Sequence, residues 1–109
     1  MRAGVSFILV AAGRGTRFGG VQPKQYKTLA GRPLWRWPAE TAGVLSSKGL
    51  VDELVLVVPQ EDRQRFPGEI SNLEVPVTLA AGGKERADSV MNGLMAARGR
   101  FVLVHDAAR

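Results

Sequence analysis

VSFILVAAGRGTRFGG (Val5–Gly20) joins a near-continuous apolar run to a glycine-rich segment that carries two arginines. The apolar run, Val5–Val10, is rich in β-branched and aromatic residues and does not alternate with polar ones. That pattern is typical of a strand that is covered on both faces of a parallel sheet. Glycines directly after such a strand let backbone N–H groups approach an anion closely. This stretch therefore predicts an α/β protein whose first strand leads into an anion-binding loop.

Three later runs have the same character and are expected to be further strands: Leu54–Val58, Val75–Ala80 and Phe101–His105. Helical segments separate them, so strands and helices alternate along the chain. This order predicts a doubly wound, mostly parallel sheet of the Rossmann-like type with right-handed crossovers. A parallel sheet that stops on its fourth strand looks unfinished. We therefore expect residues 1–109 to be the amino-terminal half of a larger domain.

Three helices are expected between the strands. The first begins at Pro33 and runs to about Leu45, and Pro38 inside it is expected to kink the helix or delay its start. The second, Gln60–Phe66, is short and is closed by the following proline and glycine. The third, Glu85–Ala97, has an apolar stripe that can pack on the sheet, made of Val90, Leu94 and Ala97.

The composition excludes several classes of protein. The chain has no cysteine, which excludes a disulfide framework, a thiolate metal site and a thiol nucleophile. No apolar run approaches the roughly 20 residues that a membrane-spanning helix needs. The first residues imitate a secretory signal, but they run directly into Gly13 and Arg14 without a polar cleavage region. We expect a cytoplasmic protein that does not bind membranes.

The net charge of +5 is distributed unevenly along the chain. Residues 1–39 hold seven basic residues and no acidic residue, whereas the remaining residues are nearly neutral. One local basic region favours an anionic partner such as a phosphate, a nucleotide or a nucleic acid. A solvated surface has the same composition, so the charge alone does not decide between the two.

Three unusual segments follow three of the expected strands: Ala11–Lys24, Gly82–Ser89 and Asp106–Arg109. In an open α/β sheet, ligands bind beyond the carboxyl ends of the strands. Segments that are far apart in the sequence are therefore expected to meet in one crevice. This convergence is a stronger indication of a binding site than any single motif.

The first two segments suit phosphate and nucleotide binding. In the first, Arg17 and Lys24 can neutralise a phosphate chain that the glycines approach, although a glycine-rich surface turn has a similar sequence. It is neither a dinucleotide fingerprint nor a Walker loop, because the third glycine of the one and the Lys-Ser/Thr pair of the other are absent. In the second, paired glycines precede a helix start that can accept an anion or a base edge, and the alternative is a flexible turn with a helix cap.

The third segment places an acid at the end of a strand. Asp106 is suited to hold Mg²⁺ against phosphates, or alternatively to cap a helix. His105 is the only histidine, and we expect a packed residue rather than a catalyst. Phosphoryl or nucleotidyl transfer needs alignment and charge neutralisation rather than a catalytic triad, and a metal with several bases supplies both.

Together the three segments resemble the 2-C-methyl-D-erythritol 4-phosphate cytidylyltransferases of the non-mevalonate isoprenoid pathway. The similar stretches are AAGRGTRFGGVQPKQYKTLAGRPL (Ala11–Leu34), GGKERADSVMNGL (Gly82–Leu94) and VLVHDAAR (Val102–Arg109). The resemblance covers essentially the whole chain. It implies transfer of CMP from CTP to 2-C-methyl-D-erythritol 4-phosphate, with release of pyrophosphate and with Mg²⁺ as cofactor.

The resemblance also implies a role for each matching residue. Arg17 and Lys24 would be catalytic and stabilise charge on the phosphates, Asp106 would place the metal, and Arg109 would bind the phosphate of the second substrate. The nucleotide would be bound by a larger set of residues: Ala11, Ala12, Gly13, Gly83, Arg86, Ser89 and Ala107.

Members of this family continue well past the HDAAR motif, and the continuation supplies further substrate-binding groups and an arm that pairs two subunits. The chain alone is therefore expected to be inactive, and the complete enzyme to be a homodimer.

Two alternatives remain open. The acceptor could be another sugar-alcohol phosphate such as ribitol 5-phosphate, because the residues that choose it lie outside this chain. The basic stretch could also belong to a non-catalytic nucleic-acid-binding module, which its lack of interleaved aromatics disfavours.

Overall fold

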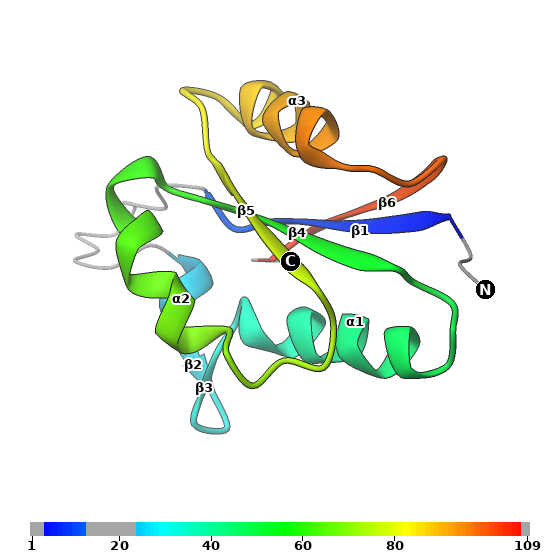
Figure 1. Cartoon of the computed structure of the whole chain (residues 1–109). Coiled ribbons are helices and arrows are strands. Elements are labelled where there is room, and N and C mark those ends of the chain that lie inside the picture. Colours follow the sequence, from blue (N-terminus) through cyan, green and yellow to red (C-terminus); the bar gives the residue numbers. More distant parts are fainter. Residues whose placement is uncertain (1–3, 13–23, 108–109) are drawn as a thin grey trace.

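A four-stranded parallel sheet forms the centre of the molecule (Figure 1). The computed structural model describes residues 4–12 and 24–107. The strands lie in the order β5-β4-β1-β6, and every neighbouring pair is parallel. Their bounds are Val5–Val10 for β1, Glu53–Val58 for β4, Val77–Ala81 for β5 and Phe101–Asp106 for β6. The chain adds β4 and β5 on one side of β1 and then returns to add β6 on the other, which confirms the doubly wound sheet.

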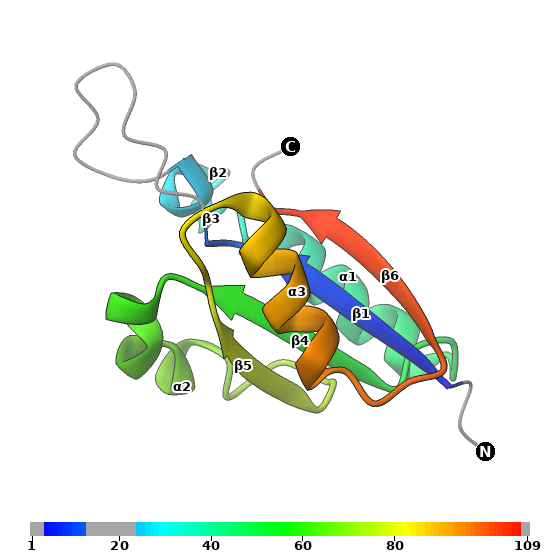
Figure 2. The ribbon, with the colours of Figure 1, turned by 90° about the horizontal axis from the view of Figure 1, so that it is seen from above.

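Helices cover both faces of this sheet (Figures 1 and 2). Helix α1 (Arg36–Ser47) lies on one face and α3 (Arg86–Ala96) on the other. A 3₁₀ turn, η2 (Gln60–Arg65), and the short helix α2 (Phe66–Glu69) connect β4 to β5. No helix in the described part of the chain is long and apolar enough to cross a membrane.

Strands β1 and β4 are apolar on both faces because both faces are buried. Phe7 and Leu9 of β1 point into the core on the α1 side, whereas Ile8 and Val10 point into the core on the α3 side. The near-continuous apolar run therefore reflects two cores rather than one. Burial of these side chains is the main favourable contribution to the stability of the central sheet.

Several element boundaries differ from the sequence expectations. Helix α1 begins at Arg36, so Pro38 lies in the first turn and delays the helix rather than kinking it. The predicted end of the second helix is wrong, because α2 continues through Pro67 and Gly68. Proline is tolerated there because the first turn of a helix has no intrahelical partner for its N–H. Strand β5 begins at Val77, after a proline that has no N–H for the sheet.

The apolar stripe predicted on α3 is wrong at Leu94, which is 38% exposed. The buried position next to it is Gly93. An ideal Cβ on this glycine would lie 2.7 Å from Cγ2 of Ile8 and 3.0 Å from Cγ2 of Val57. The helix thus approaches the sheet through a residue without a side chain, and this close approach turns Leu94 toward solvent.

A two-stranded hairpin after the first segment was not predicted. Its strands, β2 (Thr28–Leu29) and β3 (Arg32–Pro33), are antiparallel. The connecting residues Ala30 and Gly31 have φ angles of 53° and 83°, which is the arrangement of a tight hairpin turn. Alanine is uncommon at such a position, so the sequence carried no clear hairpin signal.

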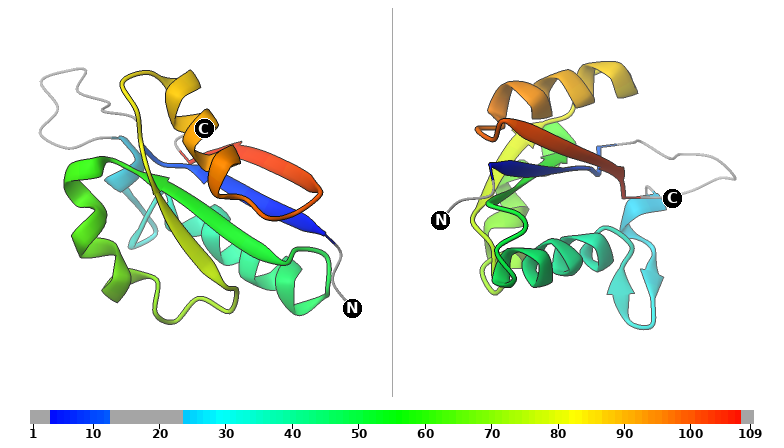
Figure 3. Two further views of the ribbon diagram at one scale, coloured as in Figure 1. Left: turned by 45° about the horizontal axis from the view of Figure 1, so that its top comes forward. Right: turned by 90° about the vertical axis from the view of Figure 1, so that its right-hand side faces the viewer.

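Strand β6 lies at one edge of the sheet (Figure 3). Its apolar side chains are exposed on both faces of the sheet. Phe101 is 62% exposed, Leu103 49% and Val104 43%. The expectation that all four strands are covered is therefore wrong for β6 among the described residues. His105 also departs from the packed environment expected for it: its ring centroid lies 6.2 Å from that of Phe7, but the residue is exposed on this same edge.

The close packing of α3 gives a stability prediction. Substitution Gly93→Ala is expected to lower the free energy of unfolding by about 1–3 kcal/mol, because the added methyl must displace side chains from two strands. The matched control is Gly68→Ala, whose added Cβ meets nothing within 4 Å, and which is expected to be neutral or slightly stabilising. Urea unfolding of both variants measures the difference. Equal effects of the two substitutions would contradict the packing described here.

Candidate functional site

The carboxyl ends of the four parallel strands lie at one edge of the sheet, and the three segments singled out by sequence meet there as far as they are described. The N–H of Ala107, after β6, donates to the carbonyl oxygen of Val10 at 2.9 Å. After β5, Gly82 packs so tightly on Ala12 that an ideal Cβ would lie 2.3 Å from the Cβ of that alanine. Nε of Arg86 lies 3.3 Å from Oδ2 of Asp106, which joins the second segment to the third.

The second segment is a fixed turn. The N–H of Gly83 donates to Oγ of Ser89 at 3.0 Å, and this serine is 3% exposed. Glu85 and Asp88 form a capping box at the start of α3, in which each side chain accepts a hydrogen bond from the other residue's backbone. The expected helix cap is therefore present, and it holds the paired glycines in one conformation beside the strand ends.

A cavity of about 230 Å³ lies at this edge of the sheet. Its lining comes from three strand ends: Ala12 after β1, Pro59, Gln60 and Glu61 after β4, and Gly82, Gly83 and Lys84 after β5. Two of the predicted nucleotide-binding residues, Ala12 and Gly83, thus share one hollow. Sequence reasoning missed Pro59–Glu61, although their position after a buried strand was a signal that could have found them.

The first segment is described only at its two ends. Both backbone groups of Ala11 are hydrogen-bonded within the protein. Its N–H donates to the carbonyl oxygen of Val57 at 2.7 Å, and its carbonyl oxygen accepts from Nε2 of Gln25 at 2.9 Å. Ala12 is therefore the residue of this pair that lines the cavity. Gly13 and Arg17 lie outside the described residues, and Lys24 is the first residue of the 3₁₀ turn η1 (Lys24–Tyr26).

A partly buried hydrogen bond connects turn η1 to η2. The hydroxyl of Tyr26 donates to Oδ2 of Asp62 at 2.6 Å, and the guanidinium of Arg65 lies 4.6 Å from the centroid of the tyrosine ring. Burial raises the pKa of Tyr26 above its ordinary value; the hydrogen bond to Asp62 and the charge of that carboxylate add to the rise, and Arg65 opposes it. Tyr26 is thus a protonated donor at neutral pH.

The third segment contributes Asp106 and Ala107. The side chain of Asp106 is 21% exposed and lies on the same face of the sheet as α3, where Arg86 reaches it. Ala107 is 4% exposed and packs in the core on the α1 side. Arg109, the predicted ligand of the second substrate, lies outside the described residues.

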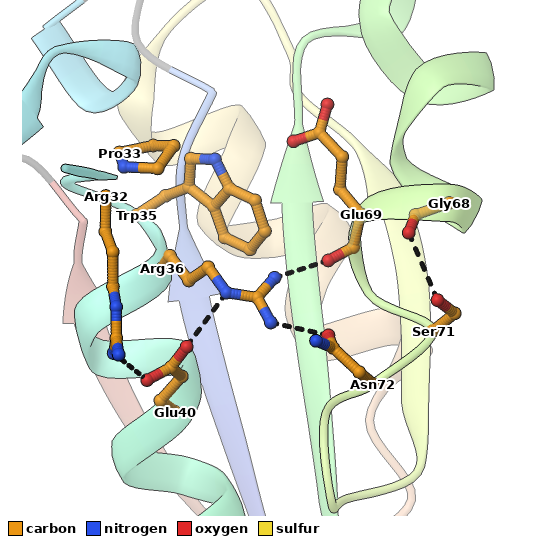
Figure 4. A pocket seen from close by; sticks show the side chains of 9 residues that line it. All are labelled: Arg32, Pro33, Trp35, Arg36, Glu40, Gly68, Glu69, Ser71 and Asn72. Carbon is orange, nitrogen blue, oxygen red and sulfur yellow. Dashed lines mark hydrogen bonds and ion pairs between the residues drawn. The ribbon is translucent and has the colours of Figure 1, made fainter.

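A cavity beside α1 is a different feature (Figure 4). It has a volume of about 510 Å³, but its charged groups are already paired. Arg36 donates to Oε2 of Glu40 at 2.9 Å and to Oδ1 of Asn72, and Arg32 also pairs with Glu40. Because none of the predicted site residues lines this cavity, we assign it a structural role in joining α1 to the segment before β5.

The described residues contain no cluster of three histidine, cysteine or acidic side chains that could hold a metal ion. Asp106, the last residue of β6, is the acidic residue of the third segment, and the two acidic residues of the second segment, Glu85 and Asp88, form the capping box of α3. A single carboxylate fits Mg²⁺, which proteins commonly hold by one or two carboxylates together with phosphate oxygens and water. It does not fit an ion that needs a cage made entirely of protein ligands.

Comparison with known proteins agrees with this geometry. Residues 5–109 match the sequence pattern of the 2-C-methyl-D-erythritol 4-phosphate cytidylyltransferase family. The chain belongs to this family. The predicted family resemblance is therefore confirmed.

Curated relatives in the cytidylyltransferase family match nearly the whole chain. A bifunctional enzyme IspD/IspF from Anaeromyxobacter dehalogenans is 49% identical over 94% of this chain, which is 25% of the relative. A 2-C-methyl-D-erythritol 4-phosphate cytidylyltransferase from Xanthomonas campestris is 43% identical over 100% of this chain and 42% of the relative. The chain thus spans less than half the length of these relatives.

A solved structure has the same fold. The crystal structure of a 4-diphosphocytidyl-2C-methyl-D-erythritol synthase from Anaerococcus prevotii aligns with a TM-score of 0.73 and 24% identity, and the alignment covers 96% of this chain and 43% of that protein. At this identity the similarity supports the nucleotidyltransferase fold, of which this chain contains a part.

The turn beside the cavity gives a second stability prediction. Substitution Ser89→Ala is expected to lower the free energy of unfolding by about 1–3 kcal/mol, because it leaves the N–H of Gly83 without its partner. Ser47→Ala is the control, since the exposed Ser47 only caps the last turn of α1, and its effect is expected to stay within about 0.5 kcal/mol. Chemical denaturation compares the two. A loss at Ser89 no larger than that at Ser47 would show that the turn does not depend on this hydrogen bond.

Proposed function

We propose that these 109 residues form the nucleotide-binding half of a cytidylyltransferase that transfers CMP from CTP to 2-C-methyl-D-erythritol 4-phosphate. Membership of the family supports the reaction. The observation that carries the proposal is the contact of three distant segments at one edge of the sheet, through Ala12 with Gly82, Val10 with Ala107, and Arg86 with Asp106. This is the edge at which open α/β sheets bind their ligands.

In the proposal, the cytosine base enters the cavity between Ala12 and Gly83. A volume of about 230 Å³ is large enough for one nucleobase, and the choice of cytosine rests on the family to which the chain belongs. The small side chains on two walls of the cavity leave backbone groups close to the base. Oγ of Ser89 accepts a hydrogen bond from the N–H of Gly83, and this bond supports the wall of the cavity that Gly83 forms.

The reaction needs little covalent chemistry from the protein. A phosphate oxygen of the methylerythritol phosphate attacks the α-phosphorus of CTP, the bond from that phosphorus to the bridging oxygen of the β-phosphate breaks, and pyrophosphate leaves with the electron pair. Positioning and charge neutralisation supply most of the acceleration of such a step. We assign the neutralising charges to Arg17 and Lys24, and the binding of the acceptor's phosphate to Arg109.

Asp106 would hold Mg²⁺, which neutralises charge on the phosphates when it is bound. In the described structure the carboxylate of Asp106 is paired with Arg86, and both side chains are at least partly exposed, so the pair contributes little stability of its own. In the proposal, the arrival of the triphosphate gives Arg86 an alternative anionic partner and leaves Asp106 for the metal.

The roles assigned to the basic residues Arg17 and Lys24 give a prediction for the complete polypeptide that carries this chain. Lys24→Ala and Arg17→Ala are each expected to lower the rate of pyrophosphate release from CTP and methylerythritol phosphate by roughly a hundredfold or more, since each removes a charge that faces the reacting phosphates. The controls are Lys48→Ala and Arg100→Ala, which remove exposed basic residues that precede the amino ends of β4 and β6, at the opposite edge of the sheet. Both controls are expected to retain the parent rate.

Several outcomes would separate this proposal from its alternatives. Undiminished turnover in both Lys24→Ala and Arg17→Ala would reject the assigned roles. Faster turnover with ribitol 5-phosphate than with methylerythritol phosphate would keep the cytidylyl transfer and change the acceptor. Tight, steeply salt-dependent binding of an oligonucleotide that CTP does not affect would favour a nucleic-acid-binding module instead.

A further inference from the structure

Gln25, the residue after Lys24, is almost completely buried, which is unusual for a glutamine. It is 2% exposed and is one of three buried polar residues among those described. Burial of a primary amide is unfavourable unless its groups are hydrogen-bonded. Nε2 of Gln25 donates to the carbonyl oxygen of Ala11 at 2.9 Å, directly at the carboxyl end of β1. The chain thus places a polar anchor where an apolar residue would fill the space without the desolvation cost.

The anchor holds a turn that is fixed on its other sides as well. The carbonyl oxygen of Gln25 accepts from the N–H of Trp35 at 3.0 Å, one residue before α1. The neighbouring Tyr26 is 6% exposed and donates to Asp62 of η2 at 2.6 Å. Turn η1 is therefore bonded to the end of β1, to the start of α1 and to η2.

These contacts connect η1 to the cavity at the strand ends. Gln60 and Glu61, which precede Asp62 in η2, form one wall of that cavity, and Ala12, which follows Ala11, forms another. The two side-chain bonds of η1 therefore end next to two walls of the same hollow. Lys24 is the first residue of η1, so the position of its backbone relative to the cavity depends on these bonds.

We propose that Gln25 is a positioning residue that sets the place of Lys24 at the strand ends, with the Tyr26–Asp62 hydrogen bond as a second anchor. This inference rests on the proposed function, in which Lys24 is catalytic. A lysine side chain has several rotatable bonds, so a fold can position its charge chiefly through the backbone that carries it. Glutamine suits the position because its amide N–H donates to a carbonyl that glutamate, when ionised, would repel.

A double-mutant cycle in the complete polypeptide separates positioning from simple stabilisation. Gln25→Met keeps much of the side-chain volume and removes the donor. It is expected to lower kcat for cytidylyl transfer by roughly tenfold to a hundredfold, because small misplacements of a catalytic group have effects of that size, while KM for CTP changes much less. In the Lys24→Ala background the same substitution is expected to change kcat by less than about twofold, since no lysine remains to be positioned.

The matched control is Val75→Ala, which weakens the core just before the amino end of β5, away from the carboxyl ends of the strands where the site lies. It is expected to lower the melting temperature and to leave kcat unchanged at temperatures well below unfolding. If Gln25→Met does not fold, Tyr26→Phe takes its place, because it deletes a single oxygen atom and breaks the second anchor. Its expected effects have the same pattern and are smaller.

The possible results distinguish the inference from the function beneath it. If Lys24→Ala retains the parent rate, the catalytic assignment of Lys24 fails and the inference fails with it. If Lys24→Ala is inactive but Gln25→Met leaves kcat unchanged, only the inference is overturned. It is also overturned if Gln25→Met lowers kcat by the same factor with and without Lys24, since the effect would then not pass through the lysine.

Discussion

The parallel pairing of β1 with its two neighbours is the constraint on which the rest of the structure depends. In this register Val10 lies opposite Asp106 of β6 on one side and opposite Val57 of β4 on the other. Because parallel strands end at the same edge, residues that follow them are brought together however far apart they are in the sequence. The candidate site is a consequence of that register, and the loops supply its chemistry.

Glycine determines how closely the layers approach at this edge. Gly93 lets α3 lie against Ile8 and Val57, and Gly82 lets the turn after β5 lie against Ala12. A side chain on Gly93 would collide with atoms of the sheet, and one on Gly82 would collide with Ala12, which follows β1. The backbone of Gly83 lines the cavity because this residue, too, has no side chain. The packing at Gly82 and Gly93 and the proposed binding role of Gly83 therefore both depend on the absence of a Cβ atom.

The order of the strands and the meeting of the three segments could be predicted because both follow from hydrophobic runs and from the geometry of parallel sheets. The outward turn of Leu94 could not be predicted from periodicity, because it depends on a tertiary contact at Gly93. The hairpin at Ala30 was missed because alanine rarely has a positive φ angle. The wall formed by Pro59–Glu61 has an ordinary loop sequence, and only its place after β4 marks it.

Backbone amide hydrogen exchange in the complete polypeptide, with and without CTP and Mg²⁺, tests the central claim most directly. The nucleotide is expected to slow exchange at Ala12, Gly83 and Ala107, which lie at the carboxyl ends of three strands. Gly4 and Gly99, at the opposite end of the sheet, are expected to keep their rates. Protection centred instead on the cavity beside Arg36 and Asn72, with no change at the strand ends, would contradict the account.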